Sequence, residues 1–479
     1  MKNKKNGLLN NLSWKFAERI AAQLVTMVVS IILARILDPS HYGTIAVVTI
    51  FITLANVFVS DGLGSALIQK KNADALDFSS VLYANIALSV VLYAVLFFAA
   101  PVIAKFFGEE YQQLTAVLRV LGLRLILTAV NSVQQAYVSR KMIFRKFFWA
   151  TLIGTVLSAV VGITMAYLGF GVWALVCQYL TNTVVDTVVL AITLKKRPMW
   201  AFSFQRVKAL LGFGLKVLST NLFSNIYKEI RAVIIGKVYS AEDLAHFDKG
   251  KQFPSLIITN INVSLSQVLF PRLSADQDDL AKLKQTTKRA IRFSAFLMCP
   301  LMLGLAAVSR NFVMVVLTEK WLPCVPLLCY ACIDFLCYPI HSTNMQALKA
   351  VGRSDLLLKL EIVKKLIELA VLLCVMTISV EAIAIAMAVC SAAFVVLNAW
   401  PNGKLIGYPL HEQLGDILPS VLMAGIMSAA VAAIGFLSLS PVLELIVQIF
   451  AGAVLYVGLA AISRNPEFRT LLSLVRRKG

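Results

Sequence analysis

The sequence predicts an all-α integral membrane protein with about 14 transmembrane helices. Of its 479 residues, 59% are hydrophobic and only 15% are charged, whereas about one quarter of the residues in an ordinary soluble domain are charged. Apolar runs of about 20 residues, the length that a helix needs to cross a bilayer, follow one another along the chain. Lys and Arg gather in every second loop between these runs, as they do in membrane proteins with a fixed orientation.

Fourteen apolar runs define the predicted spans in chain order. Each is long enough for a membrane helix, and an even number of spans places both termini on one side. The spans cover residues 14–36, 41–61, 79–104, 112–138, 147–167, 172–194, 211–238, 242–270, 290–316, 322–348, 354–377, 381–400, 415–437 and 441–462.

The charges of the loops predict the orientation. The loops on one side, together with both termini, hold 27 Lys and Arg residues, whereas the opposite loops hold only Lys105 and Lys320. Because Lys and Arg are retained in the cytoplasm, we expect a multi-pass protein with both termini cytoplasmic. This asymmetry explains most of the net charge of +20, so the basic composition does not indicate nucleic-acid binding.

A weak internal repeat divides the spans. Residues 34–50 and 236–252 each place a cation near a helix end, then a short outward turn, then an aromatic and small-polar stretch. Transporters are commonly built from such repeats. We therefore expect two pseudo-symmetric six-helix lobes, over residues 1–200 and 201–405, and two further helices with a cytoplasmic tail over residues 406–479.

One cytoplasmic loop predicts a short helix of its own. Ser274 and Gln277 have the spacing of a capping box, and apolar residues recur at helical intervals as far as Ile291, so we expect an amphipathic helix on the membrane surface. Asp276 and Asp278 form a D-x-D pattern, which could bind the metal of a nucleotide-sugar transferase. Acidic residues are also favoured in the first turn of a helix, and the helix start is the preferred interpretation.

Cysteine spacing does not predict a metal site. Cys324, Cys329, Cys332 and Cys337, with His341 nearby, scatter around a helix instead of converging, and buried cysteines usually serve as small apolar residues. No metal or catalytic residues are predicted.

The charges inside the spans are the main functional signal. Each costs at least about 2.5 kcal/mol at the bilayer centre, so such residues pair with one another or face water. Local pairing and snorkelling are the plain explanation for any one of them, Asp334 and Glu368 included. Taken together, the cations outnumber the anions, which predicts a positive cavity that attracts an anionic group such as phosphate. The cations assigned to this substrate-binding role are Arg119, Arg124, Lys216, Lys228, Arg231, Lys249 and Lys251. The carboxylates assigned to charge balance or ion coupling are Asp61, Glu229 and Asp248.

Four stretches resemble a known family. They are LARILDPSHYGTIAV (33–47), SDGLGSALIQKK (60–71), VLFPRLSADQDDLAKLK (268–284) and SRNFVMVVLTEKWLPCVPLL (309–328). In this order and on these spans, they are similar to the polysaccharide transporter family of the multidrug/oligosaccharidyl-lipid/polysaccharide exporter superfamily. The Wzx-type flippases of the colanic-acid and teichuronic-acid exporter group are the most similar in pattern.

The resemblance implies a fold and a cargo. The fold would be two six-helix lobes around a central cavity, plus two helices, as in multidrug exporters of the same superfamily. The cargo would be an oligosaccharide repeat unit on undecaprenyl pyrophosphate, delivered among membrane lipids to a polysaccharide polymerase and chain-length machinery. No cofactor is implied beyond a coupling H⁺ or Na⁺. The stretch AHFDKGK departs from the family pattern at Asp248 and leaves the coupling ion and the glycan open.

Other hypotheses about the function remain open. A lipid II flippase would share the fold and a basic cavity, and a growth phenotype separates it. Another exporter of the superfamily, of the multidrug branch, would usually have twelve spans and carry cationic cargo, which a positive cavity would repel. A membrane glycosyltransferase would use Asp276 and Asp278, but no outward loop is long enough to hold an active site.

Overall fold

Helices account for every regular element of the computed structural model, which describes residues 23–111, 113–194, 199–437 and 439–476. The all-α prediction is confirmed. Eleven helices within the described residues are long and apolar enough to cross a membrane. Two further predicted spans, 211–238 and 354–377, are helical but carry more charge. The predicted first span is described only as the helix Gln23–Ile36, and the predicted N-terminal tail lies outside the described residues.

The contacts divide the chain into two compact units, Met1–Ala245 and His246–Gly479. The division differs from the predicted lobes at one helix, α9 (Phe204–Val238), because α9 packs on three earlier helices of the first unit. Contacts of this kind do not test an internal repeat. The predicted lobes and the cavity between them therefore stay predictions.

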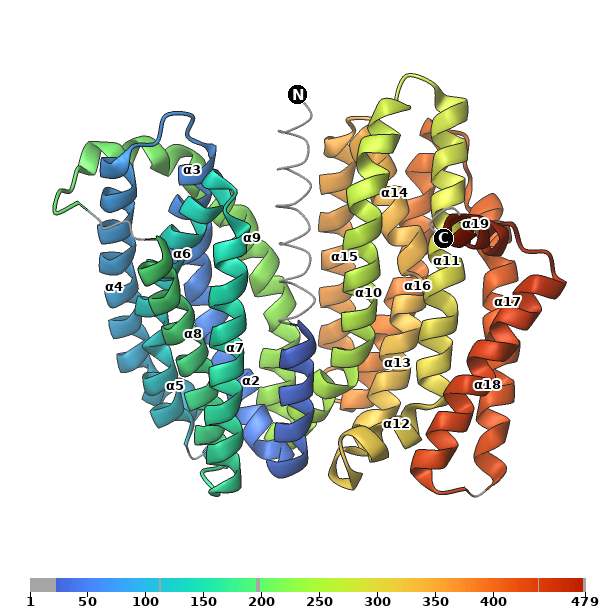
Figure 1. Cartoon of the computed structure of the whole chain (residues 1–479), viewed down its shortest axis with the longest axis horizontal. Coiled ribbons are helices and arrows are strands. Elements are labelled where there is room, and N and C mark those ends of the chain that lie inside the picture. The colour runs from blue at the N-terminus through green and yellow to red at the C-terminus, as the bar shows by residue number, and fades with distance from the viewer. Residues whose placement is uncertain (1–22, 112, 195–198, 438, 477–479) are drawn as a thin grey trace. The chain divides into compact units, whose positions relative to one another are not determined.

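The first unit is a bundle of long helices (Figure 1). Its most extensive contacts join α7 to α8 and α4 to α6, and α9 lies against α2, α3 and α4. Its elements are the helix Gln23–Ile36, α2 (Pro39–Asn56), η1 (Val57–Asp61), α3 (Leu63–Gln69), α4 (Ala75–Phe107), η2 (Glu109–Tyr111), α5 (Leu114–Gly122), α6 (Arg124–Lys141), α7 (Phe144–Tyr167), α8 (Val172–Leu194), α9 and the start of α10 (Ala241–Ala275).

The second unit continues α10 from His246. Contacts between α11 and α17 are its most extensive, and α16 packs on α13, α14 and α15. Its further elements are α11 (Leu280–Ala307), α12 (Ser309–Val316), η3 (Glu319–Trp321), α13 (Cys324–Leu336), α14 (Tyr338–Ala350), α15 (Ser354–Val375), α16 (Val380–Leu405), α17 (Leu410–Ile434), η4 (Gly435–Leu437), α18 (Pro441–Ile462) and α19 (Pro466–Arg476).

Four predicted spans are interrupted helices. A π-helical turn and Gly62 separate α2 from α3, and short breaks separate α5 from α6, α11 from α12, and α13 from α14. Pro339 in the first turn of α14 explains the last break, because proline has no N–H to continue the preceding helix. Such breaks expose backbone polar groups inside a span, which membrane proteins tolerate where the groups find other partners.

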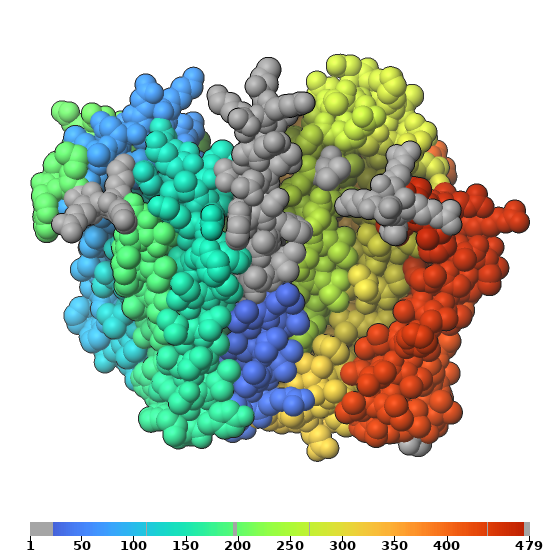
Figure 2. Space-filling view, viewed as in Figure 1, coloured from blue at the N-terminus to red at the C-terminus, as the bar shows by residue number. Residues whose placement is uncertain are grey.

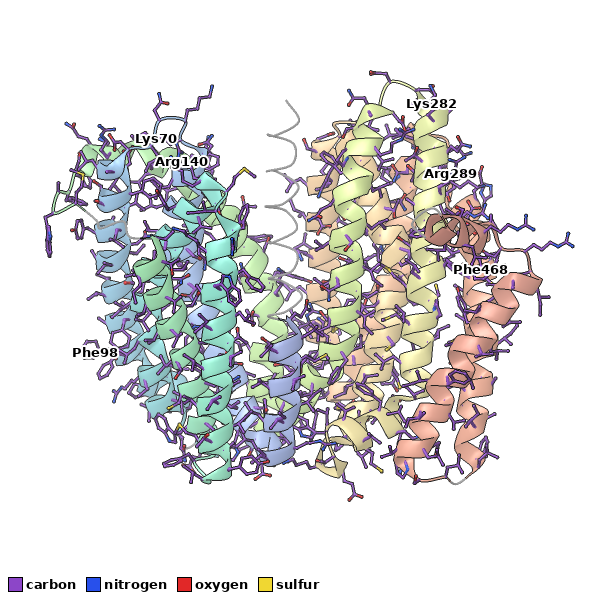
Figure 3. The ribbon with its side chains drawn as sticks, in the orientation of Figure 1. Lys70, Phe98, Arg140, Lys282, Arg289 and Phe468 are labelled. Carbon is purple, nitrogen blue, oxygen red and sulfur yellow. The ribbon has the colours of Figure 1, made fainter. Side chains whose placement is uncertain are left out.

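A buried carboxylate ties three helices together at one end of the first unit. Asp77 in the first turn of α4 is fully buried. It accepts hydrogen bonds from Lys70 Nζ at 2.7 Å, just after α3, and from Arg206 Nη1 at 3.4 Å, in the first turn of α9. Asp74 caps α4 by accepting a hydrogen bond from the backbone N–H of Asp77. This hydrogen bond holds the pKa of the Asp74 carboxyl below its usual range. Figure 3 shows Lys70 and Arg140 at this end.

The outer side of α4 is apolar and exposed. Phe98 is 74% exposed and points away from the bundle in Figure 3. Exposed apolar side chains of this kind are expected where a helix faces lipid instead of water.

The predicted surface helix beginning at Ser274 is wrong. Ser274 lies inside α10, and the next helix begins at Leu280, where the Asp279 carboxylate accepts the backbone N–H of Lys282 at 3.1 Å. From there α11 runs without a break to Ala307, because the apolar spacing used for the short helix continues into the span. Figure 2 shows the tip of this α10–α11 hairpin, in yellow-green, standing beyond its neighbours in the second unit.

The predicted C-terminal tail contains a helix, α19. Glu467 forms an ion pair with Arg292 of α11, whose Nε lies 2.8 Å from Oε1. Phe468, labelled in Figure 3, packs against the core formed by α11, α17 and α18. The short amphipathic segment after Asn465 was the available sequence signal. This part of the tail is therefore attached to the bundle.

Candidate functional site

Asp61 lies at the break between α2 and α3. The π-helical turn presents its carboxylate to α9, where Asn221 Nδ2 donates to Oδ2 at 3.1 Å, and Ser60 donates to Oδ1 at 3.1 Å. Gly214 lets the two backbones approach, since a Cβ there would lie 3.1 Å from the Gly62 carbonyl oxygen. The break in one span therefore fits against the middle of another.

The middle of α9 carries the predicted cations. No side chain of this helix is buried between Gly214 and Ile235. Lys216 and Lys228 are exposed, and Glu229 and Arg231 are partly buried. The two lysines are therefore not packed into the core of the first unit. With Glu229 and Arg231 they make four of the ten predicted site residues, more than any other helix carries.

Arg119 has a structural partner. Pro101 in α4 has no N–H to donate to the carbonyl of Phe97, four residues earlier. Arg119 Nε of α5 donates to this carbonyl at 3.2 Å, and its guanidinium lies 4.2 Å from the centre of the Phe97 ring. Inside a bilayer an unpaired carbonyl is costly, so Arg119 stabilises the proline site of α4. Its predicted role in substrate binding stays untested.

We expect Arg119→Met to destabilise the protein by about 1.5–3 kcal/mol, the usual range for a hydrogen bond to a charged group. In a Pro101→Ala background, an alanine N–H can satisfy the Phe97 carbonyl, and the same change should cost clearly less. Thermal unfolding of the purified single and double variants measures this coupling. Equal costs in both backgrounds would show that Arg119 does not act on this carbonyl.

Arg124 faces a different helix. Its Nε donates to Thr183 Oγ1 of α8 at 2.9 Å, and its guanidinium lies 5.6 Å from the Tyr179 ring centre. A second hydrogen bond joins α6 to α8, in which Asn131 Nδ2 donates to the Asp186 carboxylate at 2.9 Å. The polar partners of Arg124 thus lie on α8, whereas Asp61 faces α9.

Lys249 is packed instead of solvated. It is only 6% exposed, and its Nζ lies 5.7 Å from the centre of the Trp321 ring, against which the ring of His246 also packs. Asp248 is exposed. Lys251 lines a pocket of about 20 Å³ together with Asp334, which holds no more than about one water molecule.

A larger polar pocket in the second unit was not predicted as a site. It has a volume of about 410 Å³ and lies among α10, α13, α14, α15 and α16. We call it the polar pocket. The residues that line it are Asn262, Asp334, Phe335, Tyr338, His341, Ser342, Met345, Gln346, Lys349, Glu361, Lys364, Lys365, Glu368, Ser391, Phe394 and Asn398.

Two hydrogen-bonded walls hold the polar pocket. Between α14 and α16, the amide of Asn398 donates to His341 Nδ1 at 2.7 Å, and His341 Nε2 lies 3.1 Å from the Ser391 carbonyl oxygen. This pattern corresponds to the neutral imidazole with its proton on Nε2. Between α10 and α14, Ser342 donates to Asn262 Oδ1, whose amide in turn donates to the Tyr338 hydroxyl at 3.4 Å.

The sequence did hold a signal for this pocket. Asp334 and Glu368 were recognised as charges inside spans, but Glu361, Lys364 and Lys365 were not singled out. Glu361, Lys364 and Glu368 are three and four residues apart, so they share one face of a helix. A charged stripe along an apolar span is costly unless it faces a polar space.

A bundle of interrupted spans with charged residues inside them and a polar pocket defines a membrane transporter. The chain belongs to a family described as polysaccharide biosynthesis protein, whose model matches residues 32–326. This confirms the resemblance found in the sequence.

Curated relatives are named for polysaccharide biosynthesis, and a solved structure shares the fold. The chain is 24% identical to the succinoglycan biosynthesis transport protein ExoT of Rhizobium meliloti, over 98% of this chain and 95% of ExoT. It is 25% identical to the teichuronic acid biosynthesis protein TuaB of Bacillus subtilis, over 89% and 88% of the two chains. The lipid II flippase MurJ, in an inward closed conformation, has a similar fold, with a TM-score of 0.77, 15% identity and coverage of 97% of this chain and all of MurJ.

Proposed function

We propose that the protein is a flippase that moves an oligosaccharide repeat unit, linked to undecaprenyl pyrophosphate, across the bacterial inner membrane. The carried unit serves the synthesis of an exopolysaccharide, a capsule or an O-antigen. The observation that carries the proposal is the family match together with relatives named for the transport or synthesis of surface polysaccharides. The fold shared with a lipid II flippase supports the same type of cargo.

The predicted cations have a role in this proposal. Lys216, Lys228 and Arg231 lie on the part of α9 that has no buried side chain, and a pyrophosphate or acidic sugar would neutralise them. Transport proceeds by alternating access, and Asp61, Glu229 or Asp248 takes up a coupling H⁺ or Na⁺. Both termini are cytoplasmic, and the flipped unit passes to a polysaccharide polymerase and chain-length machinery.

Two rival functions make different predictions. A lipid II flippase would be required for growth, because cell-wall synthesis depends on its cargo. A membrane glycosyltransferase would need Asp276 and Asp278. Asp276 is only 8% exposed, and its carboxylate accepts a hydrogen bond from the Thr286 hydroxyl at 2.8 Å within the α10–α11 hairpin. That environment disfavours metal binding by the D-x-D pattern.

Deletion of the gene in its host tests the proposal. We expect loss of one surface polysaccharide without loss of viability, and full restoration by the Asp276→Asn, Asp278→Asn double variant. Arrested growth with accumulated wall precursor would favour the lipid II function. Failure of the double variant, with normal protein in the membrane, would favour the transferase.

A further inference from the structure

The polar pocket has the size of a ligand site. Its volume of about 410 Å³ falls within the roughly 300–1,000 Å³ typical of small-molecule sites. Along α15 it extends from Glu361 to Glu368, about 10 Å at the rise of an α-helix. Lys349, in the last turn of α14, lies at the pocket end predicted to be cytoplasmic. The pocket therefore extends from the predicted cytoplasmic end of α14 into the span of α15.

The charges of the pocket balance. Its lining holds the carboxylates of Asp334, Glu361 and Glu368 and the ammonium groups of three lysines. The pair between Glu361 and Lys364 is close, with Nζ 2.6 Å from Oε1. An anion would meet three carboxylates here and a cation would meet three lysines, so neither is favoured. A neutral ligand that both donates and accepts hydrogen bonds would match both kinds of group.

The remaining lining suits a sugar ring. Phe335, Tyr338 and Phe394 provide flat apolar surfaces. Asn262 and Gln346 provide side-chain amides, which both donate and accept hydrogen bonds. A pyranose has an apolar face of C–H groups and an edge of hydroxyls. Pockets that combine aromatic side chains with a few placed polar groups orient ligands of this kind.

We infer that the polar pocket binds one or two uncharged pyranose rings of the transported oligosaccharide. The inference rests on the proposed function and extends it, because it assigns the sugar part of the cargo to the second unit. The phosphate part is assigned to the cations of α9. A separate sugar site would let the protein select among repeat units that share the same lipid carrier.

Saturation-transfer NMR on the full-length protein in nanodiscs tests this inference. The probes are methyl β-D-glucopyranoside, methyl β-D-galactopyranoside and methyl β-D-glucuronide. The pocket variant is Glu361→Gln, Lys364→Met, which removes both members of a pair at once and leaves no unpaired charge. The matched control is Arg353→Gln, Asp355→Asn, which removes an exposed pair at the start of the same helix.

We expect at least one neutral glycoside to bind the wild-type and control proteins, and to bind the pocket variant about tenfold more weakly. Tyr338→Ala should weaken binding further, and size-exclusion chromatography shows whether that variant is folded. Absence of binding to the wild type, equal binding to the pocket variant, or stronger pocket-dependent binding of the glucuronide would each overturn the inference. Because surface polysaccharide is scored separately in cells, a negative result here with intact polysaccharide export leaves the flippase function standing.

Discussion

Replacement of Lys228 and Arg231 together by glutamine should abolish surface polysaccharide while the protein remains in the membrane. Both residues lie on the part of α9 that lacks buried side chains. An intramembrane charge costs at least about 2.5 kcal/mol, so its removal should not impair insertion. If the two cations bind the pyrophosphate of the cargo, the loss of both removes the attraction and transport fails. Polysaccharide staining and membrane immunoblotting measure the two outcomes.

Two controls make this experiment specific to charge at mid-helix. Lys208→Gln changes an exposed lysine in the second turn of the same helix and should leave polysaccharide unchanged. The exchange Lys228→Arg, Arg231→Lys keeps both charges and should retain most of the export. Normal polysaccharide in the double glutamine variant would remove these residues from the proposed site, and loss of the protein from the membrane would show a structural role instead.

The second large effect concerns folding. A Cβ at Gly43 in α2 would lie only 1.8 Å from the backbone carbonyl oxygen of Ala241, at the start of α10. Because backbone atoms cannot rotate away as a side chain can, Gly43→Ala should force these segments of the first unit apart. We expect a loss of about 3 kcal/mol or more, at or above the upper end for overpacking, with a strongly lowered melting temperature.

A glycine in α3 provides the control for this prediction. A Cβ at Gly64 meets nothing within 4 Å, and alanine is the better helix former by about 1 kcal/mol. Gly64→Ala should therefore be neutral or slightly stabilising. A melting temperature of Gly43→Ala close to that of Gly64→Ala would show that α2 does not approach Ala241 as described.

Eleven of the fourteen spans predicted from the sequence coincide with helices that are long and apolar enough to cross a membrane, among the described residues. The length and apolarity of a sequence segment are nearly enough to predict a membrane helix, because few structures other than helices satisfy their backbone hydrogen bonds inside a bilayer. The interruptions were harder to predict. Pro339 was visible, but the turn at Val57–Asp61 lies against α9, where Asn221 donates to Asp61 from 160 positions further along the chain. No local pattern reports such a contact.

The candidate site residues were recognisable in the sequence as charges within spans, but their contact partners were not. Lys249 and Arg119 look alike in sequence, as cations within apolar runs. In the structure, Lys249 packs against Trp321. Arg119 instead donates a hydrogen bond to the Phe97 carbonyl, for which Pro101 has no N–H. The polar pocket escaped prediction because its lining comes from five helices, in two longer stretches, 334–349 and 361–368, and two separate segments on α10 and α16.

Transport by the purified protein tests the flippase function and the role of the α9 cations together. Proteoliposomes are loaded in one leaflet with undecaprenyl-pyrophosphate oligosaccharide, and exposure of the sugar on the other side is followed with an impermeant glycosidase. We expect the wild-type protein to expose the sugar much faster than protein-free liposomes, and the Lys228→Gln, Arg231→Gln variant not to do so. Equal rates for wild type, variant and empty liposomes, with the protein folded and inserted, would contradict the central claim.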